Sequence, residues 1–120
     1  DQVLAYLFTS PTRLQDLYIQ PVAGRTAPVQ VTRSGSDAFW RIVWPKSEFI
    51  RFPDDRGQPV YARVYRPLTA HPARPAVLEI HGAGYAQGVY KSLGGSSAHG
   101  GALYAQYLAA MGATYVTLDY

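Results

Sequence analysis

Apolar and alternating runs separated by turn residues fill the first quarter of the chain. Residues 3–8 are apolar and β-prone, and after the turn Ser10-Pro11-Thr12 residues 14–22 resume with Leu17 and Ile19 alternating. Residues 29–32 alternate again, and a period of two predicts β-strands with one covered face. Three short strands do not bury both of their faces by themselves. We therefore predict an antiparallel meander of the kind that forms one blade of a repeat.

The alternation stops at a Ser-Gly-Ser-Asp sequence, which is typical of a loop between periodic segments. We place a domain boundary here, with a first domain at residues 1–34, a linker at 35–46 and a second domain at 47–120. Trp40 and Trp44 fall in the linker, and we expect them to pack across the junction as aromatic anchors.

The second domain opens with a predicted hairpin and a predicted central strand. Residues 48–52 and 60–65 alternate around an Asp-rich segment that ends at Gly57, which indicates a hairpin. Residues 76–80 are apolar apart from Glu79 and do not alternate. Such a run predicts a central strand covered on both faces.

The strongest helical pattern lies near the end of the chain. Five apolar residues recur there at i, i+1, i+4, i+5 and i+8 and form one continuous apolar face: Leu103, Tyr104, Tyr107, Leu108 and Met111. Gly112 suits the position after the helix, and residues 114–118 read as another central strand. The order strand, loop, helix, strand predicts a βαβ crossover in a parallel sheet with the hairpin at one edge. The fold class is therefore α/β.

Composition excludes several kinds of protein. The chain has 120 residues, of which 48% are hydrophobic and 16% are charged, so wholesale disorder is excluded. With no cysteine it has no disulfide, thiol nucleophile or zinc-thiolate site, and no apolar run approaches the ~18 residues of a membrane helix. The net charge is +3 and the basic residues are scattered, so no nucleic-acid partner is indicated. No second ligand stands at helical or hairpin spacing from His71 or His99, so we predict no metal site.

The loop that follows residues 76–80 is the candidate functional segment. It begins Ile80-His81-Gly82-Ala83-Gly84-Tyr85 and continues for about twenty residues before the helix. Loops of this length are usually functional or disordered, and ligands of α/β sheets bind beyond the carboxyl ends of strands. Glycines 82 and 84 would let the backbone approach a ligand closely.

Two mechanisms could use this loop. A Rossmann-type nucleotide site would need G-x-G-x-x-G, but Gln87 replaces the third glycine. Asp119, the candidate ribose ligand, also follows Gly82 by far more than the usual ~20 residues. An α/β-hydrolase oxyanion hole, in which backbone N–H groups of a His-Gly loop after the third strand stabilise an acyl-transfer intermediate, is the better match.

Several segments in order resemble the propeller–hydrolase junction of a serine peptidase of the prolyl oligopeptidase family, nearest its dipeptidyl peptidase IV-like and acylaminoacyl peptidase-like members. The segments that carry the resemblance are Thr9-Ser10-Pro11 with Asp16-Leu17-Tyr18, residues 44–52, residues 60–67, His81-Gly82-Ala83-Gly84-Tyr85 and residues 113–120. The resemblance implies the last strands of a β-propeller in residues 1–34 and the N-terminal half of an α/β-hydrolase sheet in residues 47–120.

The implied activity is hydrolysis of short peptides, with release of N-terminal dipeptides, through a Ser-His-Asp triad. The chain contains no G-x-S-x-G, and Ser96 and Ser97 lack the second flanking glycine. We therefore expect a fragment whose triad lies beyond Tyr120 and which is inactive by itself. The implied partner is a peptide substrate, no cofactor is expected, and a homo-oligomeric parent stays open. An esterase of the same fold is the alternative within the class.

The residues of the implied oxyanion loop are His81, Gly82, Ala83, Gly84 and Tyr85. Members of the family often place a Tyr where this sequence has His81, so the donor stays open among a backbone N–H, the His81 imidazole and the Tyr85 hydroxyl. We favour the backbone N–H of Gly82 or Ala83. The His81 ring could instead be hydrogen-bonded locally to hold the loop. Asp119 is expected to support the next loop through hydrogen bonds.

Overall fold

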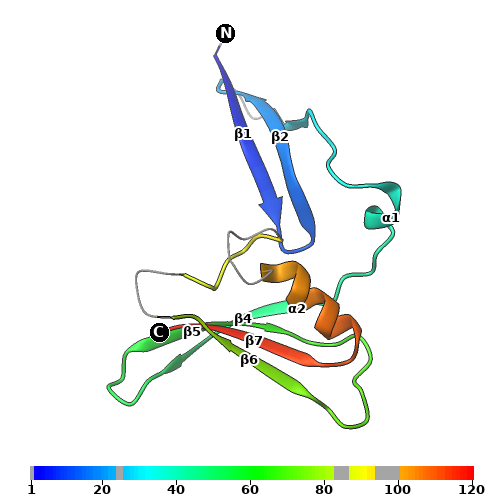
Figure 1. Cartoon of the computed structure of the whole chain (residues 1–120). Helices are drawn as coiled ribbons and strands as arrows, with labels where there is room; N and C mark the ends of the chain where they lie inside the picture. The colour runs from blue at the N-terminus through cyan, green and yellow to red at the C-terminus, as the bar shows by residue number, and fades with distance from the viewer. Residues whose placement is uncertain (1, 24–25, 83–86, 94–100) are drawn as a thin grey trace.

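The chain folds into two separate β-sheets with a helix against the second (Figure 1). The computed structural model describes residues 2–23, 26–82, 87–93 and 101–120. The first sheet has the order β1-β2-β3 and comprises β1 (Val3–Ser10), β2 (Arg13–Pro21) and β3 (Val29–Gln30). The second has the order β4-β5-β7-β6 and comprises β4 (Ser47–Pro53), β5 (Pro59–Tyr65), β6 (Ala76–Ile80) and β7 (Thr114–Asp119). Together they make a mixed α/β structure.

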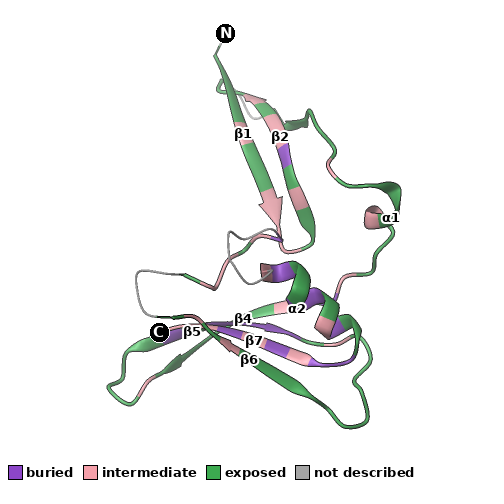
Figure 2. Ribbon diagram, in the orientation of Figure 1, coloured by how far each residue is buried: buried purple, intermediate pink, exposed green. Residues whose placement is uncertain are grey.

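The first sheet is the predicted antiparallel meander. β1 and β2 pair from Val3↔Pro21 to Ser10↔Arg13, with an irregularity between Phe8 and Ser10. β3 is only two residues long and pairs with β2. Much of this sheet is exposed, as Figure 2 shows for β1. The predicted strands are confirmed, although the third is shorter than its alternating pattern.

Asp16 ties the first sheet to the segment that follows it. This carboxylate is buried and accepts hydrogen bonds from the Ser34 amide at 2.7 Å, the Thr32 hydroxyl at 2.9 Å and the Gln30 amide at 3.0 Å. Burial alone would raise the pKa of Asp16, but these hydrogen bonds together lower it below its ordinary value. These hydrogen bonds thus hold the segment after β3 against β2, at the point where the alternating pattern ends.

The predicted linker contains a short helix, α1 (Asp37–Trp40), that the sequence pattern did not indicate. The Phe39 ring packs against the indoles of Trp40 and Trp44, with ring centroids 5.4 and 5.1 Å apart. The Arg33 guanidinium lies 4.9 Å from the centre of the Trp40 ring. The two tryptophans therefore form an aromatic cluster with Phe39 inside the linker.

The topology of the second sheet agrees with the predicted hairpin and crossover. β4 and β5 are antiparallel, from Ser47↔Tyr65 to Pro53↔Pro59, and they form one edge of the sheet. β6 and β7 are parallel, and the helix lies between them in sequence. β7 pairs with both β5 and β6 and is central, as predicted.

The prediction that residues 76–80 form a central strand covered on both faces is wrong. Among the described strands β6 pairs only with β7, and Leu78 and Ile80 are 57% and 58% exposed. An apolar run indicates only that its side chains prefer burial. The position of the strand in the sheet depends on where later strands insert. Here β7, the next strand in sequence, pairs between β5 and β6.

The helix α2 (Gly101–Ala110) lies on one face of the second sheet (Figure 1). The face that packs on the sheet consists of small and amide residues: Ala102, Ala105, Gln106 and Ala109. Alanines suit this contact because the sheet presents two large buried rings, Tyr65 and Tyr115, to the helix. Gln106 also reaches the first sheet, where its side chain donates to the Pro11 carbonyl at 3.5 Å.

The apolar face marked by the sequence is therefore not the one that meets the sheet. Four of its five members are exposed: Leu103, Tyr104, Tyr107 and Met111. Leu108 packs at the edge of the core, and the Tyr104 ring, although half exposed, meets the buried Tyr115 ring edge to face with centroids 6.1 Å apart. The helix ends at Gly112 as predicted, with a φ of +94° and hydrogen bonds from the Gly112 and Ala113 amides back into the last turn. No helix in the described ranges is long and apolar enough to cross a membrane.

Candidate functional site

His81 leaves the carboxyl end of β6 with its ring held between neighbouring groups. Its Nδ1 lies 2.9 Å from the Gly82 carbonyl oxygen, so the proton on Nδ1 is donated to that carbonyl. The ring stacks on Tyr120, with centroids 4.8 Å apart and an angle of 14° between the planes. The Tyr120 hydroxyl in turn donates to the His81 carbonyl at 2.8 Å. These contacts fix the first residue of the loop to the end of β7.

Asp119 lies beside His81 because β6 and β7 are parallel. The register pairs Ile80 with Leu118, so the next residue of each strand emerges at the same edge. His81 Nε2 is 3.6 Å from Asp119 Oδ1, and both side chains are largely shielded from solvent. The imidazole and the carboxylate thus face each other at the carboxyl end of the parallel strand pair.

The Asp119 carboxylate also holds residues 87–93, which we call the arm. It accepts hydrogen bonds from the backbone N–H groups of Gly88, at 2.5 Å, and Val89, at 3.1 and 3.2 Å. A Cβ on Gly88 would lie 2.9 Å from Thr117 Oγ1, so the arm runs directly against β7. Asp119 therefore supports the segment before α2.

Arg63 holds the other half of the arm from within the sheet. It is 1% exposed, and its Nη1 donates to the carbonyl oxygens of Tyr90, at 2.6 Å, and Ser92, at 2.8 Å. Its Nε donates to Ser47 Oγ at 3.1 Å. Burial lowers the pKa of Arg63, although the nearby Tyr65 opposes this. Leu93, at the end of the arm, is fully buried.

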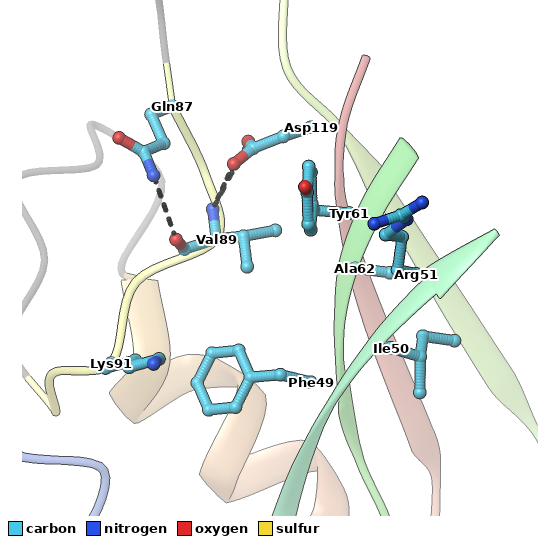
Figure 3. Close-up of a pocket in the computed structure, with 9 residues that line it drawn as sticks. All are labelled: Phe49, Ile50, Arg51, Tyr61, Ala62, Gln87, Val89, Lys91 and Asp119. Atoms are coloured by element: carbon cyan, nitrogen blue, oxygen red, sulfur yellow. Dashed lines mark hydrogen bonds between the residues drawn. The ribbon is translucent and has the colours of Figure 1, made fainter. Parts of the chain in front are cut away.

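A pocket of about 450 Å³ opens between the arm and strands β4 and β5 (Figure 3). Asp119 lines one end of it, so the pocket adjoins the His81 contact. Phe49 and Ala62 contribute to its apolar lining, and Arg51 and Lys91 contribute positive charge. Arg63 and Asp119 keep the arm close to the sheet, and the pocket is the space left between the arm and β4.

Of the predicted loop residues, the structure describes two. His81 and Gly82 lie at the end of β6, where no described atom comes within 4 Å of a Cβ built on Gly82. Packing against the described residues therefore does not require glycine there. Residues named above that lie outside the described part of the chain are Ala83, Gly84, Tyr85, Ser96, Ser97 and His99.

Sequence reasoning did not single out Arg63 or Tyr120 for the site. The signal available for Arg63 was a charged residue between two tyrosines in a strand whose other face is apolar. The signal for Tyr120 was its place directly after Asp119. The expected local hydrogen bond of the His81 ring is present. Both Asp119 oxygens already accept from the arm, which weighs against a role as a ribose ligand.

Comparison with known proteins adds no family to this description. No protein-family model matches the chain, and no curated protein matches it.

Proposed function

We propose that the chain is part of a serine peptidase of the prolyl oligopeptidase family that hydrolyses short peptides and releases N-terminal dipeptides. In this proposal residues 1–34 are the closing strands of a β-propeller, residues 35–46 link it to the next domain, and residues 47–120 begin an α/β-hydrolase domain. The chain contributes the oxyanion loop that starts at His81, while the nucleophile belongs to a later segment, since no G-x-S-x-G occurs here.

The observation that carries the proposal is the order of the second sheet. An antiparallel pair, β4 and β5, precedes a parallel pair in which β7 inserts between β5 and β6. His81-Gly82 then stands at the carboxyl end of the third strand of this sheet, which is where an α/β-hydrolase carries one of its oxyanion donors. The esterase alternative shares this sheet but does not account for the antiparallel meander before it.

The contacts around His81 suggest a division of roles. Among the described residues no acceptor is found for the Gly82 N–H, so this group is available to an oxyanion. The His81 ring, whose Nδ1–H is committed to the Gly82 carbonyl, acts as a positioning residue; Tyr120 stacks on it, and the Asp119 carboxylate faces its Nε2 at 3.6 Å. In the acyl-transfer step the serine oxygen would attack the peptide carbonyl, and the loop N–H would stabilise the resulting oxyanion.

The coding sequence that follows Tyr120 tests the proposal most directly. We expect a G-x-S-x-G within roughly the next 100 residues, after one further strand, and Asp and His later in the chain. The full gene product should hydrolyse dipeptidyl p-nitroanilides and lose this activity when the elbow serine is replaced by alanine. The 120-residue chain should not hydrolyse them. Absence of the elbow would overturn the proposal.

Asp119→Asn in the full gene product tests whether Asp119 helps to position the oxyanion loop that starts at His81. It should lower kcat about tenfold or more with little change in KM, because a misplaced donor affects the transition state more than ground-state binding. Asp37→Asn is the matched control, since Asp37 pairs only with Arg33 on an exposed surface. Equal kcat values for the two variants would contradict the role of Asp119.

A further inference from the structure

The pocket between the arm and strands β4 and β5 has the size and lining of a small-molecule site. Its volume of about 450 Å³ falls within the range in which proteins bind small ligands. Phe49 and Val89 supply apolar surface, and Tyr61 also lines the pocket (Figure 3). Such a surface suits a flat or aliphatic body that is removed from water on binding.

Two cations stand on opposite sides of this apolar surface. Figure 3 shows Lys91 on the arm at one side and Arg51 on β4 at the other. Neither makes an ion pair with a carboxylate in the described part of the chain. Lys91 Nζ lies 5.9 Å from the centre of the Phe49 ring, which keeps the ammonium beside the apolar surface.

One acidic group, Asp119, also lines the pocket, so the lining carries two cations and one carboxylate. Asp119 directs its carboxylate at the Gly88 and Val89 amides and faces the His81 ring. The net charge of the lining residues is therefore positive. Arg51 and Lys91 keep donors that can reach solvent, so an anionic ligand would gain charge-assisted hydrogen bonds there.

We propose that this pocket binds a small dicarboxylate with an apolar body. The body would lie on Phe49 and Val89, and the two carboxylates would pair with Arg51 and Lys91 at opposite sides. This site goes beyond the proposed peptidase function, because it is formed by β4, β5 and the arm and needs neither the loop after His81 nor a nucleophile. Failure of the peptidase proposal would leave it unaffected.

The test uses three probes of similar shape and different charge with the 120-residue chain. They are 1,4-phenylenediacetate, the monoanion phenylacetate and the neutral 1,4-phenylenediacetamide, titrated by calorimetry and by amide chemical shifts of the arm. We expect the dianion to bind about tenfold more tightly than the monoanion, and the diamide more weakly still. Added salt should weaken dianion binding, because both cations are exposed.

Arg51→Gln and Lys91→Gln should each weaken binding of the dianion about tenfold and leave the monoanion within a few-fold. Arg56→Gln is the matched control, because Arg56 is an exposed cation in the turn between β4 and β5 and does not line the pocket. No dianion binding up to about 10 mM, equal affinities for all three probes, or an equal loss in the Arg56→Gln variant would overturn the proposal. Melting curves of the variants show whether a loss of binding reflects unfolding. In variants that stay folded, ligand-induced changes in the amide chemical shifts of the arm show whether the dianion still binds.

Discussion

Replacing Arg63 by methionine should detach the arm from the sheet. Methionine keeps most of the aliphatic volume beside Phe49 and Tyr65 but donates no hydrogen bond. The Tyr90 and Ser92 carbonyls, which accept from Nη1 in the native protein, then lose a charged donor. The change therefore separates the anchoring role of the guanidinium from its packing.

The expected cost follows from these contacts. Loss of the charged donor costs about 1–3 kcal/mol for each of the two part-buried hydrogen bonds to the arm, and loss of the Ser47 contact adds about 1 kcal/mol. Because the variant no longer buries the guanidinium charge, part of this loss in the free energy of unfolding is offset. We therefore expect the free energy of unfolding to fall by about 3 kcal/mol, which corresponds to about 10 °C in the melting temperature of a chain of this size.

Urea unfolding and amide hydrogen exchange measure the two consequences separately. Exchange should accelerate first at Gly88 and Val89, whose amides bond Asp119, before the strand amides of β5. Arg66→Met is the control, because Arg66 pairs with Glu48 on an exposed surface and should cost at most about 1 kcal/mol. If Arg63→Met cost no more than this control, or if the arm kept its protection, the anchoring argument would be refuted.

Three further predictions concern stability. Gly112→Ala should lower the free energy of unfolding, measured in urea, by more than about 2 kcal/mol, because the added Cβ would lie 2.8 Å from the backbone nitrogen of His71. Gly57→Ala, also at positive φ but with open space around the added Cβ, should lower it by about 1 kcal/mol. Burial raises the pKa of Tyr65 to about 12, so its contribution of about 3 kcal/mol is complete below pH ~10 and is lost as the pH rises towards 12. Tyr65→Phe should make this decline in the free energy of unfolding, measured by urea titrations at alkaline pH, less steep. The decline that remains is due to Tyr115, whose pKa is also raised by burial. An unchanged slope would contradict the prediction. The depressed pKa of Asp16 stabilises the fold above its ordinary value near 4 and ceases to do so as the pH falls, so wild type and Asp16→Asn should differ at pH 7 and converge in acid.

Several features of this protein were readable from the sequence because neighbours along the chain decide them. Apolar and alternating runs around turn residues located both hairpins, and the Asp-rich turn ending at Gly57 joins β4 to β5 as predicted. Gly112 ends α2 because only a residue tolerant of positive φ suits that position. The strand, loop, helix, strand order was enough to predict the parallel pairing of β6 with β7, and hence a loop at their carboxyl end.

What only the tertiary structure decided depends on partners far away in the sequence. Hydrophobicity marked the large apolar face of α2, but the side chains that pack over the two buried tyrosines beneath the helix are mainly its alanines. Hydrophobicity likewise marked β6 as central, whereas the insertion of β7 leaves it at the edge. The arm is fixed by Arg63 and Asp119, whose partners lie about thirty residues away in the chain. Periodicity reports which residues prefer burial, but the shape and polarity of the opposing surface determine which of them are covered.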